Sequence, residues 1–290
     1  MWLFYAILGA AGKGLTNLFR KQISSIIEAD VYLWITLTLS VPFLALVLFM
    51  FNIPFVNLIT DKPLHVVASS ILWIGAIVFN IMAFKREQLS YISPLAAFIP
   101  IFSLGLGWLF LGESPPAAGL LGIAMIFAGA YIVNLKSGQV KWYDPLVHLV
   151  KNSGARYAMG VAVCFATISI ITKDVTNDGF SPIAWIFTST LSSWLILFYV
   201  PIRKTRQVKQ AAKNHTKLLL AVFAVTLFGG IFGVYSIAST TYTAYAISVR
   251  RFDILFSIIL GWKILGETQI RNKIIGGGLM TVGVLIITLL

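Results

Sequence analysis

Charged residues and cysteine are both scarce in this chain. Only 11% of its 290 residues are Asp, Glu, Lys or Arg, whereas soluble domains contain about a quarter. The single cysteine, Cys164, excludes an intramolecular disulfide and leaves a thiol catalyst without an evident partner. The three histidines lack metal-ligand spacing, and no Walker loop, cysteine pair or nucleophile elbow is present. We therefore expect neither a metal site nor a cofactor.

Hydrophobic residues, in contrast, make up 58% of the chain. In hydrocarbon every backbone N–H and C=O must be paired within its own segment, so apolar stretches of about 20 residues are interpreted as spanning helices. The predicted fold class is therefore an all-α membrane protein with ten transmembrane helices. The expected spans are residues 2–22, 31–51, 64–84, 91–111, 116–135, 155–173, 183–201, 217–238, 243–263 and 272–290.

One sequence motif occurs twice. Residues 107–113 read GWLFLGE and residues 261–267 read GWKILGE, which match at five of seven positions after 154 residues. The same offset pairs Tyr91 with Tyr245, Phe102 with Phe256, Ser103 with Ser257, Gly122 with Gly276 and Gly129 with Gly283. A repeat of this length in an apolar chain is typical of a transporter built from two halves.

The duplication has a geometric consequence. Five helices carry the chain across the membrane once, so the second half begins on the opposite side and the halves are inverted copies. We expect one five-helix repeat at 1–137, a connecting segment at 138–154 and a second repeat at 155–290. The connecting segment is either an amphipathic helix in the headgroup region or a plain linker.

Basic residues are distributed unequally between the two faces. Sixteen of the 22 lie in loops on one face, and two, Lys62 and Lys173, lie on the other. By the positive-inside rule the first face is cytoplasmic, which places both termini outside the cell or in the periplasm. The basic run from Arg203 to Lys217 is also compatible with nucleic acid or anionic lipid, but orientation explains it more simply.

A fourth or ninth apolar helix that ends in Leu-Gly-Glu, followed by a glycine-bearing helix, resembles the drug/metabolite transporter superfamily, specifically the EamA-type permeases. The resemblance covers essentially the whole chain. Pro100 matches a proline that is typical of the fourth helix, whereas Ile254 occupies the equivalent place in the second half. The resemblance implies transport of a small metabolite across the cell membrane without naming the solute.

Four charged residues lie near the middle of predicted spans. Lys13 is near the middle of the first helix, and Arg250, Arg251 and Asp253 are near the middle of the ninth. An ionised side chain at that depth costs about 2.5 to 3.5 kcal/mol or more. Arg250 and Asp253, three residues apart, are expected to neutralise one another, which leaves Lys13 and Arg251 unpaired. These two residues either snorkel or bond to carbonyl groups, or they receive an anionic group of the substrate.

Further candidates complete the predicted substrate site. Asn17, Asn80 and Tyr245 are polar or aromatic residues within spans, and an amide such as that of Asn80 needs a partner inside the bundle. Gly112 with Glu113 and Gly266 with Glu267 form a structural motif at two helix ends. Each glutamate either caps a helix or pairs with a neighbour, or it takes part in gating.

Two classes of function remain open. A secondary transporter, a permease or an exporter, explains the inverted repeat and the charges at mid-membrane. A flippase for a lipid or a lipid-linked carrier is the alternative, and a membrane-embedded enzyme is disfavoured because converging acids are absent. The expected partners are a small-molecule substrate and the lipid bilayer, with or without a coupling proton or ion. Neither nucleic acid nor any particular oligomeric state is predicted.

The charge asymmetry predicts the topology. A reporter fused to the C-terminus should be active outside the cell or in the periplasm, and a reporter inserted between Arg203 and Lys217 should be active in the cytoplasm. A cytoplasmic C-terminus in the otherwise intact protein would contradict this orientation.

Overall fold

The computed structural model describes residues 1–24, 26–86, 93–134, 147, 152–256 and 271–289, and every regular element in these ranges is helical. The first half contains α1 (Trp2–Ser24), α2 (Ala29–Met50), α3 (Val56–Asp61), α4 (Pro63–Arg86), the 3-10 helix η1 (Ser93–Phe98), α6 (Ile99–Leu111) and α7 (Ala117–Asn134). The second half contains α9 (Ser153–Asn177), α10 (Pro182–Ile196), α11 (Tyr199–Arg203), α12 (Thr205–Asn214), α13 (Thr216–Ala238), α14 (Thr243–Val249), the 3-10 helix η2 (Arg250–Phe252) and α16 (Arg271–Thr288).

Five of these helices are long and apolar enough to cross a membrane: α2, α4, α9, α10 with its continuation into α11, and α13. Shorter apolar helical stretches cover Leu95–Leu111, Ala117–Val133 and Ile275–Thr288. Each of the ten predicted ranges contains helix, although only residues 243–256 of the ninth are described. The all-helical membrane fold is therefore confirmed, while the count of ten crossings and the exact domain boundaries stay predictions.

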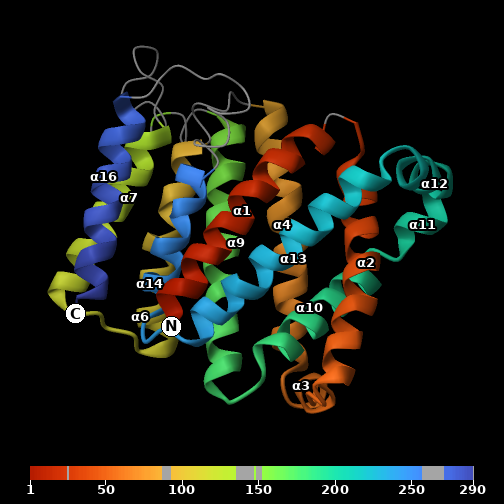
Figure 1. Ribbon diagram of the computed structural model, residues 1–290, viewed down its shortest axis with the longest axis horizontal. Coiled ribbons are helices and arrows are strands. Elements are labelled where there is room, and N and C mark those ends of the chain that lie inside the picture. Colours follow the sequence, from red (N-terminus) through yellow and green to blue (C-terminus); the bar gives the residue numbers. More distant parts are fainter. Residues whose placement is uncertain (25, 87–92, 135–146, 148–151, 257–270, 290) are drawn as a thin grey trace.

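The two halves are packed as a two-fold relationship requires. The N- and C-terminal ends lie at the same end of the bundle (Figure 1). α1, the first helix of its half, packs on α13, the third long helix of the other half, and α9 packs on α4 in the equivalent way. The last helices of the two halves, α7 and α16, pack on each other. Each half therefore donates its first helix to the other.

Glycines allow α7 and α16 to approach closely. A Cβ atom added to Gly122 would lie 2.8 Å from the carbonyl oxygen of Gly283, and one added to Gly129 would collide with the carbonyl of Gly276. In the sequence repeat, however, Gly122 corresponds to Gly276 and Gly129 to Gly283. Gly122 thus contacts Gly283, which is the counterpart of Gly129, and Gly129 contacts Gly276, which is the counterpart of Gly122. This exchange is the pattern of a self-complementary two-fold interface.

Ion pairs join the halves in the loops. Lys204, after α11, reaches Glu28 at 2.5 Å and Asp30 at 2.6 Å, which lie at the N-cap and in the first turn of α2. The hydrogen bonds that Lys204 donates to Asp30 and Glu28 raise its pKa above the ordinary value. Lys62, before α4, makes the equivalent contacts with Asp178 at 2.5 Å, at the C-cap of α9, and with Asp174 at 3.3 Å, in the last turn of α9. The two sets of loops are related by the repeat.

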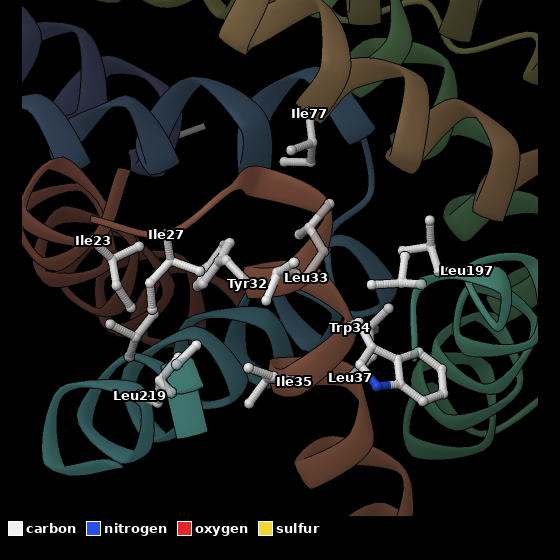
Figure 2. Close-up of a cluster of buried hydrophobic side chains, with 14 residues drawn as sticks. Ile23, Ile27, Tyr32, Leu33, Trp34, Ile35, Leu37, Ile77, Leu197 and Leu219 are labelled. Atoms are coloured by element: carbon white, nitrogen blue, oxygen red, sulfur yellow. The ribbon is translucent and has the colours of Figure 1, made fainter. Parts of the chain in front are cut away.

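A buried apolar cluster fills the space beside these loops. Ile23, Ile27 and Leu33 come from α1, α2 and the turn between them, while Leu197 and Leu219 come from the second half (Figure 2). Burying apolar surface within the protein adds close packing contacts, which are the main attraction between helices in lipid. The α1–α2 turn is therefore anchored to the second half by both packing and ion pairs.

The glycine contact between α7 and α16 is testable. Changing Gly129 to alanine should lower the stability of the purified protein by about 1 to 3 kcal/mol, because its Cβ would lie 2.7 Å from Cγ of Met280. The matched control is Gly278→Ala in α16, where no atom lies within 4 Å and alanine is the better helix former. Thermal unfolding in detergent measures both, and equal midpoints would contradict the close contact.

Candidate functional site

The charged residues of the ninth predicted helix lie on an interruption of that helix. α14 ends at Val249, the 3-10 turn η2 follows at Arg250–Phe252, and helix resumes at Asp253. A stretch of 3-10 helix within a longer helix often marks a functional position. Arg251 and Asp253 are 4% and 3% exposed, so the turn holds both side chains inside the protein.

Asp253 forms an ion pair with Lys13 across the two halves. The Lys13 Nζ atom lies 3.2 Å from an Asp253 carboxylate oxygen, and it lies 5.8 Å from the centre of the Phe165 ring in α9. The expectation that Lys13 has no acidic partner was therefore wrong. Lys13 and Asp253 are 240 residues apart, so spacing along a single helix gives no sign of this pair.

Arg250 extends in another direction. Its guanidinium lies against the backbone of α13, where a Cβ atom added to Gly233 would be 2.6 Å from Nη2. The expected local ion pair between Arg250 and Asp253 is thus replaced in the structure by the pair between Lys13 and Asp253. The reason is tertiary: glycine leaves room for Arg250 beside α13, while α1 packs against η2 and presents Lys13 to the carboxylate.

Within the described ranges, neither guanidinium group forms an ion pair, although Asp253 attracts both electrostatically. The Nε atoms of Arg250 and Arg251 are buried, and neither has a hydrogen-bond partner among the residues that the structure describes. Lys13, Arg250, Arg251 and Asp253, which we call the charged cluster, interact electrostatically with one another. A buried polar group without a partner calls for an explanation, and a bound ligand or water is the usual one.

The repeat shows that the fold does not need these charges. The offset of 154 residues places Ala96, Ala97 and Ile99 of the first half where Arg250, Arg251 and Asp253 lie in the second. η1 and η2 overlap under this offset, so the backbone turn is shared. The offset of 152 residues that relates the first and sixth predicted helices, as in Tyr5 and Tyr157, places Lys13 opposite Phe165.

The counterpart of the ion pair is an apolar contact. Phe165 and Ile99 belong to one hydrophobic cluster, with Ala162 and Ala246. The same architecture is thus completed by apolar residues on one side of the two-fold axis and by charges on the other. Phe165 was missed in the sequence, although the offset of 152 residues could have drawn attention to it.

Glu113 holds the start of the helix that carries the charged cluster. Its carboxylate accepts hydrogen bonds from the backbone N–H of Thr243 at 2.8 Å and from the Thr243 hydroxyl at 2.6 Å. Gly112 ends α6 with a φ of 65°, a left-handed conformation that favours glycine. A carboxylate at a helix N-terminus is stabilising, so the first half caps α14 of the second half. Gly266 and Glu267 lie outside the described residues.

Lys173 strengthens the same region. Its Nζ atom donates a hydrogen bond of 2.6 Å to the carbonyl of Thr240, in the turn before α14, and Glu113 attracts it electrostatically. The sequence placed Lys173 on the outer face, at the last residue of the predicted span 155–173, whereas α9 continues to Asn177 and Lys173 is 6% exposed. The sequence feature that could have indicated this buried role is the position of Lys173 within an otherwise apolar segment.

Of the other candidates, neither Tyr245 nor Asn80 is joined to the charged cluster by a hydrogen bond or an ion pair among the described residues. Tyr245 packs between Trp2 and Tyr242 and lines a cavity of about 430 Å³ at the start of α14. Asn80 lies on α4, and no hydrogen bond or ion pair of the described residues joins it to the charged cluster. Asn17 lies in α1, but its side chain is outside the described part of the structure. No group of three His, Cys, Asp or Glu side chains in the described ranges could hold a metal ion.

The ion pair between the halves leads to a mutational prediction. Asp253→Asn alone should lower the folded yield more than Asp253→Asn combined with Lys13→Met, because the single change leaves a lysine without its partner in low dielectric. Asp253→Asn combined with Arg250→Gln should restore less of the folded yield than the combination with Lys13→Met. Size-exclusion profiles and thermal midpoints measure the difference, and equal losses in all three variants would argue against the pair.

Comparison with known proteins identifies the family. The profile of the EamA-like transporter family matches residues 1–135 and 152–289. One solved structure, described only as the crystal structure of a protein, is similar over 99% of this chain and 96% of its own, with a TM-score of 0.74 and 15% sequence identity, which shows a shared fold alone. No curated protein sequence matches the chain. Because the family profile covers both halves, the chain belongs to the EamA-like transporter family.

Proposed function

We propose that this protein is a secondary transporter that moves a small anionic or zwitterionic metabolite, such as an amino acid, across the cell membrane by alternating access. Membership of the EamA-like family supports transport of small solutes across a membrane. In transporters with inverted repeats, the substrate site lies near the middle of the membrane between the two halves. The composition of the charged cluster supports such a site, since Lys13 comes from the first half and the other three residues from the second.

The observation that carries the proposal is a pair of buried guanidinium Nε atoms that have no hydrogen-bond partner among the residues described by the structure. Arg250 and Arg251 remain positively charged under all physiological conditions. A planar guanidinium forms two parallel hydrogen bonds with a carboxylate or a phosphate. We therefore assign to Arg251, and to Arg250 beside it, the role of receiving the acidic group of the solute. The ion pair with Asp253 assigns Lys13 to holding the site together.

Counterflow in liposomes tests this function. The purified protein is reconstituted in vesicles of fixed lipid composition and screened with amino acids, organic anions, sugars and aromatic amines. Saturable exchange of a carboxylate-bearing solute is expected. The same assay with a labelled lipid distinguishes a metabolite permease from a flippase, because only a flippase would move the lipid.

The Arg251→Gln variant should bind the carboxylate-bearing solute at least about tenfold more weakly, since charge-assisted hydrogen bonds contribute about 1.5 to 3 kcal/mol. Its thermal midpoint should stay close to that of the wild type. The matched control is Arg206→Gln on α12, an exposed arginine outside the cluster, which should leave transport unchanged. Robust transport of a quaternary ammonium compound, unaffected by Arg251→Gln, would contradict the proposed function.

A further inference from the structure

The charge of the site narrows the class of solute. Building on the proposed function, we infer that the charged cluster takes a dianion: a small solute with two negative charges on oxygen atoms, such as a dicarboxylate or a phosphate monoester. The inference depends on the positions of the acidic residues, on the charge left over in the cluster, and on hydroxyl groups beside it.

Acidic residues are few enough to be accounted for individually. The chain has ten, of which Glu87, Asp144 and Glu267 lie outside the described residues. Of the seven described, six lie away from the cluster, at or near helix ends. Glu28 and Asp30 bind Lys204, Asp174 and Asp178 bind Lys62, Asp61 accepts a hydrogen bond from Thr60, and Glu113 caps α14. In the described part of the chain only Asp253 is left to balance the three basic residues.

The net charge follows from the ion pair. With Lys13 and Asp253 both ionised at 3.2 Å from one another, the two side chains together contribute zero. The guanidinium groups of Arg250 and Arg251 do not deprotonate in proteins. Within the described ranges, the cluster therefore carries two positive charges in the absence of solute.

A dianion is the solute that this charge fits best. Uncompensated charge is costly in a medium of low dielectric. A monoanion would leave one guanidinium without a counter-charge, and a zwitterion would leave the net charge unchanged. A dianion neutralises both groups and leaves the ion pair between Lys13 and Asp253 intact.

Hydroxyl groups beside the cluster support an oxygen-rich ligand. The Ser248 hydroxyl is fully buried and has no hydrogen-bond partner among the described residues. Ser248 precedes Arg251 by three residues, which places both on one side of the helix. A buried hydroxyl on the same side of the helix as a guanidinium is a suitable second donor to an oxyanion, and it would stay unsatisfied against an apolar solute.

Matched pairs of solutes test the inference in the wild-type protein. Succinate is compared with its monoamide, succinamate, and methyl phosphate with dimethyl phosphate, so that each pair differs by one negative charge. Alanine serves as the zwitterion. Binding is measured by the shift of the thermal midpoint and transport by counterflow in liposomes. At least one dianion should bind about tenfold or more tightly than its monoanionic partner and than alanine, and the pair that responds distinguishes a dicarboxylate from a phosphate.

Charge variants then locate the effect. Arg250→Gln removes one positive charge, so the preference for the dianion should fall about tenfold or more. Arg250→Lys keeps the charge and should largely retain the preference, which guards against a variant that simply folds poorly. The exposed control Arg206→Gln should leave the preference unchanged.

The outcomes separate this inference from the proposed function. A monoanion or alanine that binds as tightly as the dianions, in a manner weakened by Arg251→Gln, would overturn the dianion and leave the anion transporter standing. Dianion binding that is unaltered in both Arg250→Gln and Arg251→Gln would place the ligand elsewhere and overturn the inference. The absence of exchange for every anionic and zwitterionic solute would overturn the proposed function itself.

Discussion

The close backbone contact between α1 and α13 determines where the charged cluster forms. A Cβ atom added to Gly12 would lie 2.7 Å from Cα of Gly229, and one added to Gly9 would lie 3.0 Å from the backbone nitrogen of Gly233. Small residues allow helices in a membrane to approach until their backbones touch, and the gain is van der Waals attraction along the whole contact. This contact brings Lys13 beside the chain around η2, and it leaves at Gly233 the space that the Arg250 side chain occupies. The packing of two apolar helices thus creates the polar site.

Symmetry separates what the fold requires from what function requires. The two halves share the 3-10 turn, the glycines at the contact between α7 and α16, and the ion pairs in the loops, so these features belong to the architecture. They do not share the charges, because Phe165 and Ile99 lie where the repeat places Lys13 and Asp253. An apolar contact at this point is compatible with the fold, and buried ion pairs often stabilise a protein no better than apolar residues of similar size. Because the charged residues occur on one side of the two-fold axis and not on the other, a role in recognising the solute is favoured over a role in the fold.

The fold was largely predictable from the sequence, whereas the partners within the site were not. Hydropathy and prolines gave the helical ranges, and the duplicated motif gave the two-repeat architecture, because both depend on local composition or on comparison of the chain with itself. The partner of Asp253 is on a helix 240 residues away, and local spacing wrongly favoured Arg250. The role of Lys173 was hidden in a similar way, since a backbone carbonyl at Thr240 leaves no trace in the sequence. Glu113 marked a helix end correctly, but the helix that it caps belongs to the other half.

The helices that pack together as a bundle are not the same set as the helices of one sequence repeat. α1 belongs to the first half, yet it packs on α13, α14 and η2 of the second, and its Lys13 is held there by Asp253. α9 packs on α4, η1 and α6 in the reciprocal way. Separating Lys13 from Asp253 would leave two ions unpaired in low dielectric, at a cost of several kcal/mol, and it would also break the backbone contact at the glycines. Any rearrangement that keeps these contacts must therefore move α1 with the helices of the second half. The interfaces that are free to change are then those between the two bundles so formed, and Arg250 and Arg251 both lie on the bundle that contains α1 and α13.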